Sequence, residues 1–164
     1  MDYYLNQIKT KVYRSCSLEI LNFRLEQESR EYAACRFELN GKYIVCRTAK
    51  ITPKKSGLFV TFWKRNEGGP IEPFNETDET DFYVVNVHTE KKIGQFVFPK
   101  SILIKKGIVS TKEKEGKRAF RVYPGWDIPN NKQAERTQKW QLNYFYEVNN
   151  SIDFKRVLEL HENK

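Results

Sequence analysis

The dipeptide Asn40-Gly41 restricts the fold more than any other feature, because it predicts a tight turn between two antiparallel strands. Asn and Gly tolerate the positive φ angles that a two-residue hairpin requires. Apolar and polar residues alternate over 32–39, and a second strand is predicted at 42–48. In this register Cys35 faces Cys46 at a hydrogen-bonded pair position, where side chains stand farther apart. We read both cysteines as small buried core residues, with a redox pair as the less favoured alternative.

Hydrophobic periodicity predicts the other elements. Residues 17–30 show no clear period. The expected elements are a first helix at 3–14, strands at 58–64, 81–88, 93–98, 108–110 and 118–123, a short helix opened by Pro99, a long helix at 131–147 and a last helix ending near His161. Together these predict an α+β fold, with an N-terminal helix, an antiparallel sheet of about six or seven strands and C-terminal helices. So many short strands can also curl into an open barrel.

Alternation within two of the strands predicts which side chains face solvent. In 58–64, Leu58, Val60 and Phe62 form the natural core set, so Trp63 points to the polar side. In 42–48, Arg47 is expected on the outward face.

Length and composition predict a single domain over residues 1–164 that needs no disulfides. No apolar run approaches 18 residues, so we expect no membrane association. The N-terminus lacks the apolar segment of an export signal, and three cysteines without metal-type spacing suit a reducing compartment. A cytoplasmic location is the expectation.

Charge is segregated along the chain, and this is the main functional signal. Residues 42–65 carry seven basic side chains and no acidic one, 66–90 carry seven acidic and no Lys or Arg, and 91–121 carry ten basic against two acidic. Aromatic residues are interleaved with the first basic block. Cations neutralise phosphates and aromatic faces stack on bases, so the pattern predicts a polyanionic partner, nucleic acid above all.

Other chemistries have weaker support. The first basic block could instead be an ordinary solvated face. Asp81 followed by Glu90 and Lys92 resembles the carboxylate-lysine pattern of metal-dependent nucleases on paper, but the latter two fall in a predicted turn. Nothing supports a nucleophilic Cys46–His88 dyad. We expect no catalytic residues, no metal site and no cofactor.

Several segments of this sequence resemble the bacterial MepB family. They are RTAKITPKKSG (47–57), FVTFWKR (59–65), FVFPK (96–100), RVYPGWD (121–127) and TQKWQ (137–141), and the resemblance extends over roughly residues 1–146. It implies a single cytosolic domain without a known cofactor, and a connection with an operon that encodes a multidrug efflux pump and its repressor. It implies no established activity.

We therefore expect a non-enzymatic nucleic-acid-binding protein, with DNA favoured over RNA and a weak sequence preference. A regulatory protein partner in the efflux system is the alternative. The candidate nucleic-acid-binding residues are Arg47, Lys50, Lys54, Lys55, Trp63, Lys64, Arg65, Lys117, Arg118, Arg121, Trp126, Gln138 and Lys139.

Overall fold

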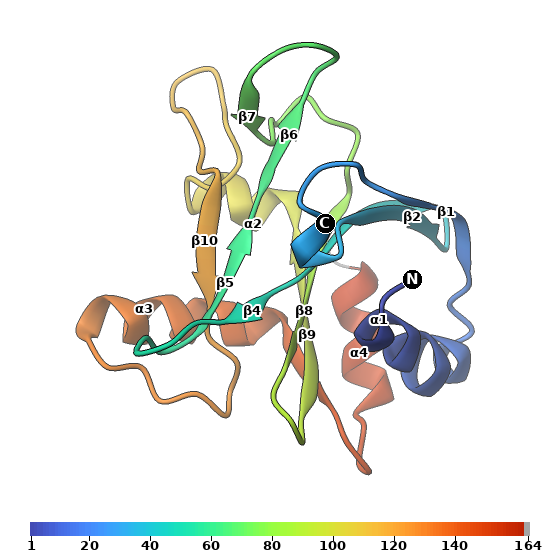
Figure 1. The fold of residues 1–164 in the computed structure, drawn as a ribbon. Helices are drawn as coiled ribbons and strands as arrows, with labels where there is room; N and C mark the ends of the chain where they lie inside the picture. Colours follow the sequence, from blue (N-terminus) through green and yellow to red (C-terminus); the bar gives the residue numbers. More distant parts are fainter. Residues whose placement is uncertain (163–164) are drawn as a thin grey trace.

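A computed structural model describes residues 1–162 and shows a layered α+β arrangement (Figure 1). The helices are α1 (Tyr3–Ile8), α2 (Lys100–Lys105), α3 (Lys132–Gln141) and α4 (Phe154–Glu162). Short helical turns lie at Lys9–Tyr13, Arg14–Cys16, Arg30–Tyr32 and Leu142–Tyr144. The strands are β1 (Ile20–Leu25), β2 (Cys35–Leu39), β3 (Lys42–Thr48), β4 (Lys50–Ile51), β5 (Leu58–Thr61), β6 (Trp63–Arg65), β7 (Ile71–Pro73), β8 (Phe82–His88), β9 (Ile93–Pro99), β10 (Ala119–Val122) and β11 (Phe145–Val148).

The largest sheet, here sheet A, has six strands in the order β1-β2-β3-β8-β9-β11. The predicted hairpin is confirmed, since β2 and β3 are antiparallel with Cys35 opposite Cys46. Both cysteines are buried free thiols. One pairing in the sheet, β3 with β8, is parallel. Parallel neighbours need a crossover connection, and residues 49–81 supply it.

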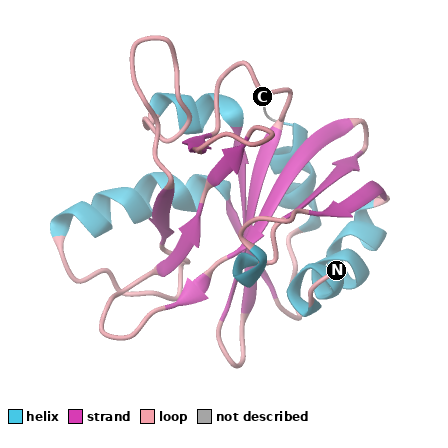
Figure 2. Cartoon of the chain, turned by 45° about the horizontal axis from the view of Figure 1, so that its top comes forward, coloured by secondary structure: helices cyan, strands magenta, loops and turns pink. Residues whose placement is uncertain are grey.

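That crossover forms a second layer. Its strands β4 and β5 join β10 in a three-stranded sheet, here sheet B, ordered β10-β5-β4. The next two strands, β6 and β7, pair in a small hairpin. The sheets are open rather than closed into a barrel across the described residues (Figure 2). None of the helices within residues 1–162 has the length and apolar character to cross a membrane.

Two hydrophobic clusters hold the layers together. One lies between sheet A and the helical side of the molecule, with Ile8 of α1 and Val157 of α4 among its members. The other lies between sheet A and sheet B, and it includes Phe62, Phe74 and Phe98. Figure 1 accordingly shows α1 and α4 on one side of β8 and β9, with β5, β10 and α3 on the other.

The structure adds one strand where the sequence predicted no element, and it corrects two predicted elements. Residues 17–30, which have no clear period, contain the edge strand β1. The helix predicted at 131–147 ends at Gln141, and β11 follows after one tight turn. Ile108 and Val109 lie outside any strand, and Ser110 forms an isolated bridge with Asn75.

Candidate nucleic-acid interface

The outer face of sheet B brings the two basic stretches of the sequence together. Lys50 of β4 lies opposite Phe59 of β5, and Phe59 lies opposite Arg121 of β10. One row across the sheet is therefore cation, aromatic ring, cation. The inner face carries Leu58 and Val60, both buried. The alternation predicted for this strand is confirmed, and it leaves Phe59 on the outside.

Arg121 also fixes the neighbouring loop, residues 52–57. Its guanidinium donates to Thr52 Oγ1 at 2.8 Å and to Ser56 O at 3.3 Å, and its Cζ lies 5.7 Å from the centre of the Phe59 ring. Gly57 has a φ of +76°, and a Cβ there would meet Tyr123 Cε1 at 2.6 Å. The loop is thus held against β10, and it presents the exposed side chains of Lys54 and Lys55 beside the sheet.

A segment that sequence reasoning missed crosses the same face. Thr61 Oγ1 donates to Ser29 Oγ at 2.9 Å, and the ring of Tyr32 lies 6.2 Å from that of Phe59. Lys50 Nζ stands 5.1 Å from the centre of the Tyr32 ring. The segment 29–32 therefore adds a second aromatic ring, Tyr32, to the outer face of sheet B. Its sequence has no period that could have revealed this contact.

A groove of about 290 Å³ continues this surface between β10 and α3. Its cations are Lys106, Lys117 and Arg121, and none of its lining residues within 1–162 is an Asp or Glu. Lys106 Nζ lies 5.4 Å from the centre of the Trp140 ring, which also lines the groove. The groove thus repeats the combination of cation and aromatic ring found on sheet B.

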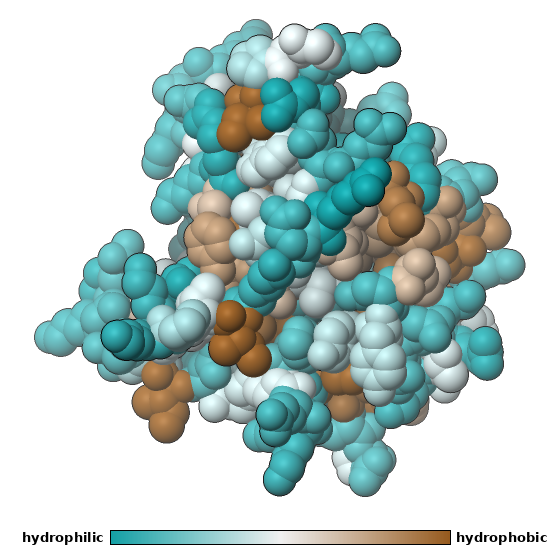
Figure 3. Space-filling model, in the orientation of Figure 1, coloured by the Kyte–Doolittle hydropathy of each residue, from teal (hydrophilic) through white to brown (hydrophobic). Residues whose placement is uncertain are grey.

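Figure 3 shows the space-filling surface from the side on which Figure 1 displays β4, β5 and β10. Hydrophilic side chains cover most of this side, including a band across its centre, and the strongly hydrophobic ones occur mostly as small separate patches. The four cations Lys50, Lys54, Lys55 and Lys117 are exposed, and none forms an ion pair with the described residues. Here and below, these four side chains together with Arg121 are called the cationic face.

Arg47 does not belong to this face, which corrects its expected outward position. The second layer covers the side of β3 from which it projects, and only 2% of the residue is exposed. Its guanidinium donates to Cys46 O at 3.0 Å and Trp63 O at 3.4 Å. Burial lowers the pKa of Arg47 to about 10. An arginine held in this way cannot meet a phosphate on the surface.

Three other expected phosphate ligands already have acidic partners. Lys64 Nζ lies 2.6 Å from an oxygen of Asp78 and 3.5 Å from one of Glu72, and its side chain is only 19% exposed. Arg65 pairs with Glu28 at 2.9 Å, and Arg118 pairs with Glu115 at the same distance. The last two pairs are exposed and contribute little energy, so only Lys64 is effectively neutralised.

The remaining candidates lie in different settings. Trp63 is half-buried on the outer side, with the guanidinium of Arg65 5.8 Å from its ring centre. Trp126 packs edge-on against Phe145, 5.7 Å away. Gln138 donates through Nε2 to the backbone oxygens of Pro124 and Asp127, both at 2.9 Å, so it braces a turn instead of reading bases. Lys139 is exposed on α3.

Gln141, which was not a predicted site residue, secures the edge strand of the cationic face. Its buried amide donates to Arg121 O at 2.9 Å and accepts from Tyr123 N at 2.8 Å. Replacing Gln141 by Leu leaves both groups buried without partners, and we expect a loss of about 2 kcal/mol of stability. Urea unfolding measures the effect. The exposed Gln133→Leu serves as the control and should change stability by less than about 0.5 kcal/mol.

The residues of the weaker alternatives are not brought together. Asp81 precedes β8 and Glu90 follows it, so the whole seven-residue strand separates them. Among residues 1–162, no group of three or more His, Cys, Asp or Glu side chains is arranged to hold a metal ion. His88 stacks on Tyr4 with 3.7 Å between the ring centres. Cys46 is buried, and Asn86 Nδ2 lies 3.5 Å from its sulfur.

Comparisons with known proteins agree with the resemblance seen in the sequence. A family model described as MepB-like matches residues 26–147. A solved structure, titled Crystal Structure of MepB, superposes with a TM-score of 0.79 at 36% sequence identity. This match covers 90% of the present chain and 99% of the other. No curated protein sequence matches the chain. On the family model and the structural match together, the chain belongs to the MepB-like family.

Proposed function

We propose that this protein binds nucleic acid without catalysing a reaction on it, and that the cationic face is the contact surface. The observation that carries the proposal is the row Lys50–Phe59–Arg121 across sheet B. It combines residues from two segments about 60 positions apart in sequence, which is the expected outcome if segregated charge serves one surface. Alternating cations and rings suit a phosphate backbone with bases beside it.

DNA is the first ligand to test, and a weak sequence preference is expected. The cationic face consists of four lysines and one arginine already bound to a loop, with the rings of Phe59 and Tyr32 beside them. Phosphate contacts position a protein on a nucleic acid but carry no sequence information directly. Gln138, the candidate residue with a side-chain amide, donates its hydrogen bonds within the fold.

The alternative, a regulatory protein partner within an efflux system, has less support. It gives weight to the acidic segment 67–81, yet Glu72 and Asp78 of that segment pair with Lys64. The efflux connection implied by the family resemblance is compatible with either function in the cytoplasm. Capture of the pump's repressor together with indifference to nucleic acid would favour this alternative.

Fluorescence anisotropy with labelled duplex DNA, single-stranded DNA and RNA, each at several salt concentrations, tests the proposal. If all five cations of the cationic face neutralise one phosphate each, log affinity should fall with log salt at a slope near −4.5 on duplex and about −3.5 on single strands. An intact plasmid after incubation with Mg²⁺ and Mn²⁺ is expected. No binding to any of the three polymers at low salt would refute the proposal, and cleavage would refute its non-catalytic part.

A further inference from the structure

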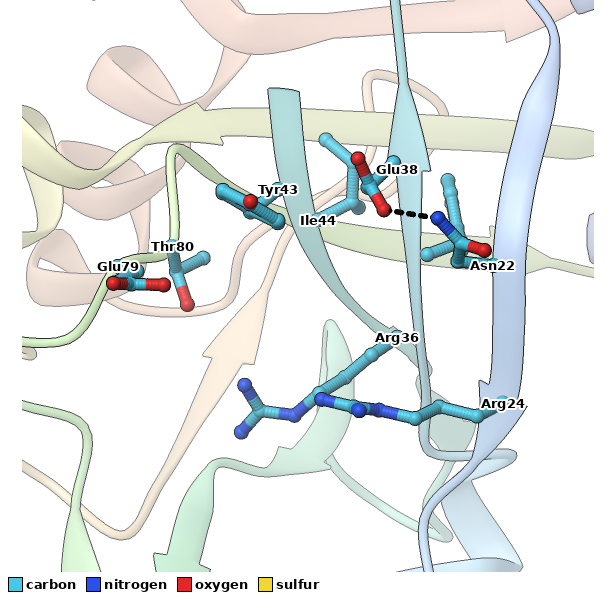
Figure 4. A pocket seen from close by; sticks show the side chains of 9 residues that line it. Asn22, Arg24, Arg36, Glu38, Tyr43, Ile44, Glu79 and Thr80 are labelled. Carbon is cyan, nitrogen blue, oxygen red and sulfur yellow. Dashed lines mark hydrogen bonds between the residues drawn. The ribbon is translucent and has the colours of Figure 1, made fainter. Parts of the chain in front are cut away.

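A pair of arginines lies apart from the cationic face, in a cavity of about 180 Å³ beside the first three strands of sheet A. Figure 4 shows the side chains of Arg24 and Arg36, which are cross-strand neighbours, at one end of this cavity. Glu38 and Tyr43 lie at the other end, and Thr80 and Glu79 form a further side. The lining residues are Asn22, Arg24, Arg36, Phe37, Glu38, Tyr43, Ile44, Glu79 and Thr80.

The two arginines are direct neighbours across strands β1 and β2. Like charges in directly opposed positions destabilise a sheet. Arg36 forms an ion pair with Glu26, whereas the exposed Arg24 has no hydrogen-bond partner within residues 1–162. At the far end, Glu38 is engaged by the amide of Asn22. Glu79 also lines the cavity, on the side formed with Thr80, so the lining as a whole holds two arginines and two glutamates. Arg24 is the cation of this lining that forms no ion pair with the described residues, and the arginine end of the cavity can therefore accept an anion.

Two buried polar side chains, which do not line the cavity, lie behind it in the core. Arg36 lies opposite Val45, and Val45 lies opposite Tyr83, so the same row leads into the core. The buried hydroxyl of Tyr83 and the buried Nε of Arg47 have no hydrogen-bond partner in the described structure. Burial is the main cause of the lowered pKa of Arg47, and the charge of Arg36 acts in the same direction. The carboxylate of Glu26 acts in the opposite direction, and Arg47 adds positive charge behind the two arginines.

We propose that the cavity between Arg24, Arg36 and Thr80 binds a phosphate group. Guanidinium forks match phosphate oxygens in a bidentate way, and two of them suit a dianion better than a single carboxylate. The phosphate can come from a free phosphate monoester or from the end of a nucleic-acid strand. This phosphate site does not depend on the proposed nucleic-acid binding, because it can be tested with inorganic phosphate alone.

The test is a titration with inorganic phosphate at constant ionic strength, followed by thermal unfolding and by the ³¹P line width. Wild type should show saturable stabilisation. Arg24→Gln should bind phosphate at least about tenfold more weakly, since it removes charged hydrogen bonds. Without phosphate, Arg24→Gln should be as stable as wild type or more stable, because the substitution removes one of two like charges in opposed positions. Arg136→Gln, another exposed arginine, should behave as wild type.

Two outcomes would overturn the site: no saturable response in wild type, or an equal response in Arg24→Gln. If that variant fails to fold, Arg24→Lys keeps the charge but loses the fork and should bind several-fold more weakly. Oligonucleotides with and without a 5′-phosphate distinguish the two sources. If a 5′-phosphate increases the affinity for an oligonucleotide and Arg24→Gln abolishes that increase, the ligand is a strand end. If adenosine monophosphate competes with inorganic phosphate and the 5′-phosphate of the oligonucleotide has no effect, the ligand is a free monoester.

Discussion

A chain carrying Lys50→Glu, Lys54→Glu and Lys55→Glu should bind nucleic acid about 100-fold more weakly than wild type at physiological salt. Each lysine that neutralises a phosphate releases counterions, and losing three such contacts removes about 2.7 from the salt slope on duplex DNA. All three side chains are exposed and lie on or beside sheet B, so the fold should be unaffected. Anisotropy titrations at three salt concentrations measure both quantities.

The matched control reverses three exposed lysines elsewhere: Lys11 in the turn after α1, Lys91 in the β8–β9 turn and Lys155 in α4. The change in net charge is the same in both triple variants. If affinity depends only on total charge, the two variants should weaken binding equally, and that result would contradict the localised interface. A loss confined to the sheet B variant would support it.

Phe62→Ala should destabilise the protein by about 4 kcal/mol, the largest stability effect that we expect. Phe62 is fully buried between the layers, with ring centres 4.8 Å from Phe74, 5.0 Å from Phe120 and 5.1 Å from Tyr83. Truncation removes contact with all three rings and leaves a cavity that the surrounding sheets cannot fill. Denaturant unfolding followed by tryptophan fluorescence gives the value.

Phe62→Leu is the companion variant. It keeps most of the buried volume, and it should lose much less stability than the alanine variant. Where the folded form still dominates, both variants should retain nucleic-acid binding, because Phe62 lies on the inner face of sheet B. Equal losses in the two variants would show that the interlayer contact tolerates a cavity, against our reading of this core.

The sequence predicted local elements better than their layering. Asn40-Gly41 and the alternation through Phe62 depend on backbone geometry within a few residues, and both were confirmed. Strand β1 escaped detection because its pairing is irregular at Asn22, whose φ of 54° interrupts the period. The apolar residues of β11 continue the helical spacing of the apolar residues in α3, so the sequence pattern predicted a helix through β11. The parallel β3–β8 pairing joins segments that no local pattern links.

Local sequence patterns also predicted only part of the candidate nucleic-acid interface. Charge predicted the members of the cationic face, including Lys50 and Arg121, and the structure places those two in one row. Charge alone could not show that Arg47 is buried or that Lys64 is paired. Whether a cation on a strand faces water depends on what covers that strand, and here the cover is formed by a different part of the chain.

The crossover formed by residues 49–81 has a consequence for the order of folding. Strand β8 can join β3 only after the intervening chain has been drawn into a compact shape, and long-range parallel pairing of this kind is slow to form. The hairpins β2–β3 and β8–β9 can each assemble early from neighbouring residues. Closure between them should be the late step, and the surface that carries Lys50 and Phe59 is completed in that same event.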